Sequence, residues 1–191
     1  MRFTLRENEW VLDFLNTAEW YFVYELPGLA SGKGFSEEVK NSMLPPPIVD
    51  KEGNPVDSED TDDWNEFVRP DLEDGFAQER AIVSNDIDAA EKTDNPLEWF
   101  YDDEEIPENF PEGPMWRVVV KTEHTEQWYS VLNQTRIMMN KEHGLAEDDS
   151  RFLMALFGTD SEEIPQEKAL MLAQYEFYCV IQNILVENIM N

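Results

Sequence analysis

The spacing of hydrophobic and polar positions divides the chain into helical blocks separated by two acidic, proline-bearing segments. The first block predicts a helix over residues 8–26, because Trp10, Phe14 and Tyr21 recur on one helical face. The Pro-Gly step that follows this block is predicted to end the helix.

Later segments repeat the helical spacing of apolar residues. Helices are predicted over residues 64–68, 72–91, 123–143, 149–157 and 165–189. Pro70 is predicted to end the short helix before it. Thr122 is the predicted N-cap of the helix over 123–143, and Gly144 its C-terminal stop. The last helix is apolar on most sides, which predicts a central, buried position.

Two short runs have strand character. They lie near residues 2–6 and 116–121, and the second is the only β-branched run in the chain. A lone strand leaves its backbone groups unpaired, so the two are expected to pair with each other. The predicted fold is therefore mainly α: a single helical domain over residues 1–191, with four to five main helices and a two-stranded ribbon. A sheet of four or more strands would contradict this predicted fold.

The two segments between the helical blocks are predicted to be mobile surface loops. They span residues 29–60 and 93–114, and both are rich in proline and acidic residues with little apolar periodicity. Proline removes a backbone donor and glycine raises the entropy cost of ordering, so neither segment favours a regular element.

The net charge of the chain limits the classes of molecule that it is expected to bind. The 191 residues include 14 Lys and Arg against 42 Asp and Glu, a formal net charge of −28. Such a surface repels nucleic acid and anionic lipid, and attracts a basic protein, a metal ion or a cationic small molecule. Because 41% of the residues are hydrophobic, the chain can still bury a core. A basic protein is the predicted partner.

The cysteine count, the N-terminal residues and the longest apolar stretch together predict the cellular location. Cys179 is the only cysteine, which excludes an internal disulfide and suits a reducing compartment. The N-terminus has no apolar signal-peptide core. The most apolar stretch, residues 175–190, is interrupted by polar residues and falls short of a membrane span. A soluble cytoplasmic protein is expected.

The segment from Trp128 to Leu145 contains the tryptophan, then Leu132-Asn133 and Arg136, and a closing glycine-hydrophobic step followed by acidic residues. In these features it resembles the DUF2017 family of actinobacterial domains of unknown function. The resemblance covers most of the chain outside the two loops. It implies a mainly helical fold and no particular activity. Members of that family commonly sit near genes for a Clp-protease adaptor and a JAMM-type metallopeptidase, which implies a link to proteolysis.

The sequence contains no recognisable catalytic, metal-binding or cofactor-binding motif. Asn133 and Arg136 lie three residues apart and so share a helix face. They are candidates for a polar pocket that recognises a carboxylate or a backbone strand. The alternative is that Arg136 is a structural guanidinium that pins an acidic neighbour. The same two interpretations apply to Arg69, Arg80 and Arg117.

Exposed aromatic residues are the other candidate contact surface, namely Trp64, Trp99, Phe100 and Tyr101. The favoured hypothesis is a non-enzymatic regulatory or adaptor protein acting through protein contacts. An enzyme of unrecognised type, with an acidic pocket and aromatic walls, is the alternative. A third class is an acidic mimic of nucleic acid. An adaptor needs an exposed apolar patch, an enzyme needs a cleft with titratable groups, and a mimic needs a carboxylate stripe on a rigid helix.

Overall fold

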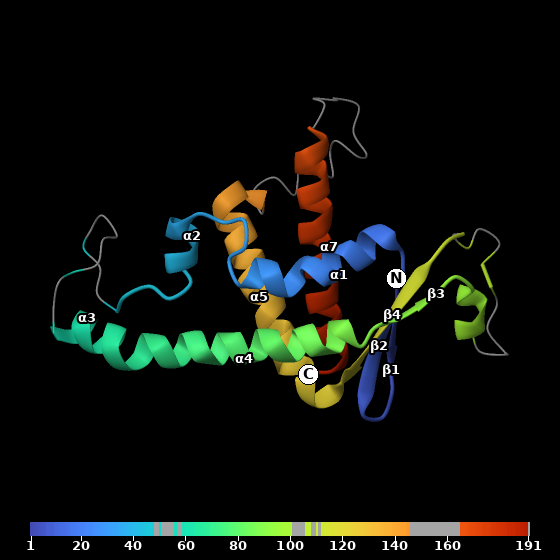
Figure 1. Ribbon diagram of the computed structural model, residues 1–191, viewed down its shortest axis with the longest axis horizontal. Helices are drawn as coiled ribbons and strands as arrows, with labels where there is room; N and C mark the ends of the chain where they lie inside the picture. The colour runs from blue at the N-terminus through green and yellow to red at the C-terminus, as the bar shows by residue number, and fades with distance from the viewer. Residues whose placement is uncertain are drawn as a thin grey trace.

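The computed structural model describes residues 1–47, 50, 56, 59–100, 106, 107, 110, 112–145 and 165–190. The predicted mainly helical fold is confirmed. A long horizontal helix, α4, crosses one side of the molecule, α7 stands upright behind it, and a small sheet lies at one end (Figure 1). The predicted helix over 149–157 lies outside the described residues.

The sheet corrects the prediction of a two-stranded ribbon. It has four antiparallel strands in the order β1-β2-β4-β3. The predicted strands near 2–6 and 116–121 do form, but both pair with an unpredicted strand between them rather than with each other. The strands are β1 (Arg2–Leu5), β2 (Glu9–Leu15), β3 (Glu91–Thr93) and β4 (Met115–Lys121).

Strand β2 occupies a segment predicted to be helical, so the first half of the helix over 8–26 is wrong. Every residue of β2 after Glu9 is buried. A strand covered on both faces lacks polar alternation, and its apolar run can be read as a helix. The helix begins only after Asn16, whose side chain accepts from the N–H groups of Ala18 and Glu19 at 2.9 and 3.1 Å. Glu19 accepts from the Asn16 N–H in return, which completes a capping box.

Helix α1 (Thr17–Ala30) continues past the predicted Pro-Gly stop and ends at the cap residue Ser31. A short helix, α2 (Glu37–Asn41), follows inside the predicted loop 29–60. Ser36 caps α2, because its hydroxyl accepts from the Val39 N–H.

The next helical segment is one long rod. It begins with α3 (Glu59–Asp63), passes through a π-helical turn (Trp64–Val68) and continues as α4 (Arg69–Asp88). Pro70 does not end a helix as predicted but lies in the first turn of α4. A π turn widens the backbone and is a common accommodation for a local interruption of helical hydrogen bonding. The helix therefore passes the proline unbroken.

Two 3₁₀ turns complete the connections, at Pro96–Trp99 within the predicted loop 93–114 and at Thr122–His124. The predicted N-cap role of Thr122 is wrong: its buried hydroxyl has no hydrogen-bond partner among the described residues, and the 3₁₀ turn leads directly into α5 (Thr125–His143). Gly144 ends α5 in the left-handed conformation at φ 65°, as predicted.

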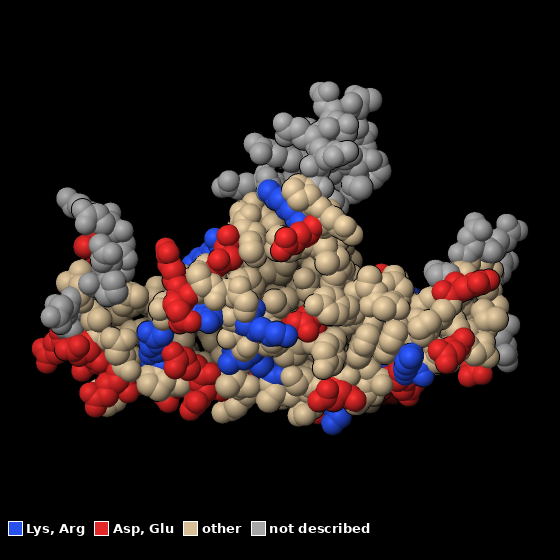
Figure 2. All heavy atoms as spheres, turned by 45° about the horizontal axis from the view of Figure 1, so that its top comes forward, with Lys and Arg blue, Asp and Glu red and all other residues tan. Residues whose placement is uncertain are grey.

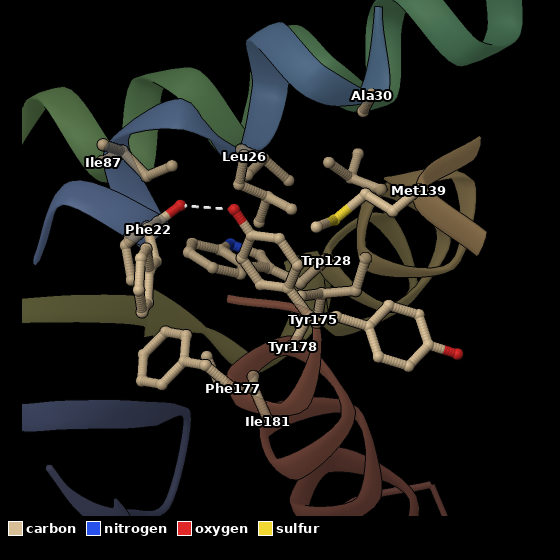
Figure 3. Close-up of a cluster of buried hydrophobic side chains, with 14 of the residues drawn as sticks. Phe22, Leu26, Ala30, Ile87, Trp128, Met139, Tyr175, Phe177, Tyr178 and Ile181 are labelled. Atoms are coloured by element: carbon tan, nitrogen blue, oxygen red, sulfur yellow. Dashed lines mark hydrogen bonds between the residues drawn. The ribbon is translucent and has the colours of Figure 1, made fainter. Parts of the chain in front are cut away.

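The core lies where α1, α5 and α7 (Gln166–Asn188) meet the sheet. Figure 3 shows α7 presenting Tyr175, Tyr178 and Ile181 towards α1 and α5. The Tyr178 hydroxyl donates to the Phe22 carbonyl at 2.7 Å and accepts from Gln174 at 2.8 Å. Trp10 and Trp128 pack edge to face at 5.2 Å, and both are fully buried. Each such side chain contributes about 1.5–3 kcal/mol by burial.

Helix α7 is longer than the apolar stretch considered in the sequence. Because it begins at Gln166, it is long and apolar enough to cross a membrane by length and composition alone. The expectation that this region falls short of a membrane span is therefore wrong by that measure. Its inward face is buried against the protein core through Leu172, Tyr178, Ile181 and Leu185, which is compatible with the core helix of a soluble protein.

Candidate functional site

A cleft of about 260 Å³ opens between the end of α1, helix α2, the first half of α4 and the middle of α5. On the face in Figure 2, several Lys and Arg side chains lie near the middle, interspersed with Asp and Glu side chains, while Asp and Glu side chains are densest at the left end. This grouping is unexpected in a chain with three acids for every base. The cleft is therefore the candidate functional site.

Three cationic side chains line the cleft, one from α2 and two from α4. Lys40 Nζ lies 2.7 Å from Glu37 Oε1, and Arg69 Nε lies 2.8 Å from Glu73 Oε1. These two cations therefore already have carboxylate partners, each on the same helix as itself. The third cation is Arg80.

Arg80 contacts an amide rather than a carboxylate. Its Nη1 donates to Gln134 Oε1 at 3.2 Å. The orientation of that amide is fixed, because Gln134 Nε2 donates to Glu79 Oε2 at 3.1 Å and to Ser130 Oγ at 3.2 Å. Gln134 is only 3% exposed, so α5 holds a fully engaged polar group at the floor of the cleft.

The Glu79 carboxylate shares the Gln134 amide with Arg80 and interacts with its charge, but Arg80 makes no direct ion pair with a described carboxylate. Arg80 is half-buried, and no described acidic group lies within ion-pair distance of it. Burial lowers the pKa of its guanidinium from the ordinary value, and the adjacent Glu79 carboxylate opposes that shift. The nearby Glu79 oxygen is occupied by Ser130, whose hydroxyl donates to it at 2.6 Å. Most of the Arg80 donors are thus available to a ligand that enters the cleft.

The rest of the lining is apolar and adaptable. Ala30, Met43, Leu44, Phe76 and Met138 contribute to it, from four different segments. Methionine is unbranched and fills irregular spaces, so two methionines allow the wall to fit side chains of different shapes. A cation beside an apolar wall suits a ligand that carries a negative group next to an apolar one.

Helix α2, one wall of the cleft, is fastened to the end of α5. Glu142 accepts from the Ser36 backbone N–H at 3.0 Å and from its hydroxyl at 2.8 Å. These two hydrogen bonds lower the pKa of the Glu142 carboxyl below its ordinary value. Lys141 Nζ also donates to the Ser42 carbonyl at 3.3 Å. The carboxylate form of Glu142 therefore helps to keep the cleft in shape.

The turn between α1 and α2 depends on Gly32. Its φ is 89°, and a Cβ atom built there would lie 2.8 Å from Lys40 Cγ. Glycine is needed both for the left-handed backbone and for the close approach of the Lys40 stem. This turn sets the position of Lys40 in the lining of the cleft.

The predicted pair Asn133 and Arg136 is on α5, beside the cleft residue Gln134 but not in the same setting. Asn133 is exposed. Arg136 Nη1 donates to Gln182 Oε1 on α7, and its guanidinium lies 5.4 Å from the centre of the Tyr175 ring. Its described partners are thus an amide and an aromatic ring. Its buried Nε has no hydrogen-bond partner among the described residues.

Two of the predicted contact aromatics lie against the sheet. Trp99 and Phe100 are half-buried, with ring centres 6.0 and 4.8 Å from that of Phe14. Phe14 has a φ of 56° at an irregularity in the β2–β4 pairing. Trp64 is half-buried on the π turn, and Tyr101 lies outside the described residues. The aromatic residues with greater exposure are Phe67, Tyr24 and Tyr21.

The same end of the sheet buries a charged cluster. Asp13 is 1% exposed and lies between two arginines: Arg2 Nη2 is 3.1 Å from its Oδ2, and Arg117 Nε donates to its Oδ1. The Arg117 guanidinium also lies 4.5 Å from the centre of the Trp99 ring. This cluster joins β1, β2 and β4 and explains Arg117 as a structural guanidinium.

A carboxylate–histidine pair joins α4 to α5. Asp86 Oδ2 lies 2.9 Å from His124 Nδ1 and accepts from Trp128 Nε1 at 2.9 Å. The pair has the first two members of a nucleophilic triad, yet the described residues place no hydroxyl or thiol nucleophile in hydrogen-bond contact with His124. Its role in the described structure is to attach the end of α4 to the start of α5.

The described residues also hold no group of three or more His, Cys, Asp or Glu side chains arranged for a metal.

Comparison with known proteins gives one positive result. A family described as a domain of unknown function, DUF2017, matches residues 42–189, which is more than half of the chain. The matched region includes α4, α5 and α7, and with them Arg69, Arg80 and Gln134 of the cleft. No curated protein and no solved structure matches the chain. The chain belongs to the DUF2017 family.

Proposed function

We propose that this protein is a non-enzymatic adaptor or regulatory protein that binds a basic protein partner in the cytoplasm. The observation that supports the proposal most strongly is the first half of the long helical rod, residues 59–74, which we call the acidic rod. It is helical throughout and it carries exposed acidic and exposed apolar side chains together.

The apolar part of the acidic rod is larger than expected for a surface that serves only solubility. Phe67 is 61% exposed, and Val68 and Leu72 are also exposed. Exposed apolar side chains within an acidic surface suit a partner segment that is basic and partly apolar. Arg69 and Glu73 of the same rod line the cleft, so a bound partner can reach both surfaces.

The net charge of the chain predicts the sign of the charge on the partner. With a net charge of −28, the chain attracts a basic protein at long range and repels nucleic acid. The carboxylates of the acidic rod also support a second function, in which the protein mimics nucleic acid and blocks a DNA-binding protein. The exposed Phe67 and Leu72 favour the adaptor, because a mimic of a phosphate backbone needs no apolar contacts.

The test is affinity capture at low salt from the native cell extract, with three baits. The first bait is the wild-type chain and the second is the Phe67→Ala, Leu72→Ala double variant. The third is Leu170→Ala, a control at a residue 51% exposed on α7. We expect wild type and Leu170→Ala to recover the same basic protein, and the double variant to recover much less.

Equal recovery by all three baits would contradict the acidic rod as the contact surface. Recovery of a DNA-binding protein that added duplex DNA displaces would favour the mimic instead. The link to proteolysis stays a prediction, which the identity of the captured partner tests.

A further inference from the structure

We propose that the cleft binds the free C-terminal carboxylate of a protein chain whose last side chain is apolar. This inference rests on the proposed function, since the terminus belongs to the basic partner, and it assigns a chemical group to the cleft. It goes beyond the acidic rod, which explains attraction to basic residues but not the cations in the cleft.

The charge of the lining selects a ligand with one negative charge. Lys40 pairs with Glu37 and Arg69 pairs with Glu73, whereas Arg80 has no direct ion-pair partner among the described residues. The Glu79 carboxylate, which is hydrogen-bonded to the same Gln134 amide, offsets part of the Arg80 charge. A single carboxylate can accept hydrogen bonds from the remaining guanidinium donors of Arg80. A phosphate dianion brings a second negative charge beside Glu37 and Glu73 and is disfavoured.

The shape of the Arg80 group also suits a carboxylate. A guanidinium presents N–H donors in a planar fork that matches the two oxygens of a carboxylate. Gln134 holds one Nη atom of Arg80, and its own amide is locked by Glu79 and Ser130. The arginine is therefore already positioned before a ligand enters, which reduces the entropy cost of binding.

The apolar lining of the cleft suits the apolar side chain of the ligand's C-terminal residue. Phe76, Met43 and Met138 lie in the same cleft as Arg80. The volume of about 260 Å³ is below the roughly 300–1,000 Å³ of drug-sized sites, and so suits one terminal residue rather than a long segment. Asn41 and Ser31 also line the cleft. Asn41 Oδ1 accepts from Arg69 Nη2 at 3.1 Å, and the Ser31 hydroxyl donates to the Gly28 carbonyl at 2.7 Å, which leaves the Ser31 oxygen able to accept from the backbone N–H of that residue.

The experiment compares two acetylated hexapeptides that contain two lysines and end in leucine, one as the free acid and one as the C-terminal amide. Isothermal titration measures their affinity for wild type, Arg80→Gln, Arg80→Lys and Lys121→Gln. Lys121 is an exposed cation on β4 and controls for the loss of one charge. We expect wild type and Lys121→Gln to bind the acid about tenfold more tightly than the amide. Arg80→Gln should lose this preference, and Arg80→Lys should retain part of it.

A second measurement uses only the wild-type protein, so it does not depend on whether the Arg80 variants fold. In the wild-type protein, the side-chain amide resonances of Gln134 should shift with the acid and not with the amide. Equal affinity for acid and amide, or an unmoved Gln134 amide, overturns the inference. If the peptides fail in this way while capture by the acidic rod succeeds, the proposed function stands and only the cleft assignment falls.

The last part of the experiment tests whether the carboxylate belongs to a protein C-terminus or to a small molecule. The small acid 4-methylpentanoate carries the same carboxylate and apolar group without a peptide. We expect it to compete only weakly with the free-acid peptide, because it lacks the terminal amide and the lysines. Competition as strong as that of the peptide itself would show a small-molecule site and would overturn the assignment to a protein terminus.

Discussion

Arg80 of α4 and Gln134 of α5 are joined by a hydrogen bond of 3.2 Å from the guanidinium to an amide oxygen that no other described group uses. The same amide donates to Glu79 and Ser130, so one buried side chain fixes three polar groups from two helices. Arg80 is thus held by a neutral amide and keeps guanidinium donors for a ligand, unlike Lys40 and Arg69 of the same cleft, which are in ion pairs.

Replacing Gln134 tests this network. Gln134→Leu leaves Arg80 and Glu79 without their amide partner in a half-buried setting, and we expect a loss of about 1–3 kcal/mol in the free energy of unfolding. Urea denaturation measures it. Asn133→Leu, at the exposed neighbouring residue, is the control and should change stability by about 0.5 kcal/mol or less. Equal effects of the two substitutions would show that the network contributes nothing specific.

The buried Asp13 cluster should be among the most sensitive points of the sheet. Asp13→Asn leaves Arg2 and Arg117 facing each other without their shared carboxylate, and we expect a loss of about 3–5 kcal/mol. Glu9→Gln removes the carboxylate partner of Arg6 in an ion pair far more exposed than the Asp13 cluster, and should cost about 1 kcal/mol or less. Thermal and urea unfolding of both variants measure the difference. A cost for Asp13→Asn as small as that for Glu9→Gln would contradict the structural role of the cluster.

Glycine substitutions separate backbone strain from contact with Lys40. Gly32 and Gly34 both have positive φ, at 89° and 86°, but only Gly32 places a Cβ atom against Lys40. Both alanine variants should lose about 1–3 kcal/mol from left-handed strain, and Gly32→Ala should lose more. The comparison of the two unfolding free energies measures the close approach. If Gly34→Ala costs as much as Gly32→Ala, Lys40 has room to move aside.

Burial raises the pKa of Tyr178 well above its ordinary value of 10, and its hydroxyl is the donor to Phe22. Because the folded protein holds the neutral phenol, this contribution to stability is fully present below about pH 10 and is lost as the pH rises beyond it. Tyrosinate absorbance at 295 nm should therefore show a late step that coincides with alkaline unfolding. Tyr178→Phe should remove that step, and its persistence in the variant would contradict the assignment.

The elements predicted correctly are those with one clear period or one clear signal. The helix α5 ends at Gly144 as expected, because its apolar stripe and its left-handed stop are both local. Strand β2 was missed because burial on both faces removes the polar alternation that identifies a strand. Strand β3 has three residues, too few for any periodicity. The prediction that Pro70 ends the helix before it was wrong because the preceding π turn lets the helix continue past the proline, and the sequence does not reveal that turn.

The cleft could be foreseen only in part. Arg80 lies within the apolar stripe of α4, between Phe76 and Val83, and a cation on an apolar face is a signal for a partly buried charge. Its partner Gln134 and the distance to Lys40 depend on tertiary packing. Lys40 belongs to a segment predicted as a loop, so nothing in its local sequence places it near Arg80. The juxtaposition of α2 with α4 is therefore a finding of the structure alone.

The central claim is that this acidic protein recognises a basic partner through charge. The most direct measurement is the association rate and Kd between the wild-type chain and the captured partner across a salt series. Exposed charges are screened over about 8 Å at physiological ionic strength, so the association rate should fall steeply with salt while dissociation changes little. An affinity indifferent to salt would contradict electrostatic recognition and would leave the exposed apolar residues Phe67 and Leu72 as the whole of the contact.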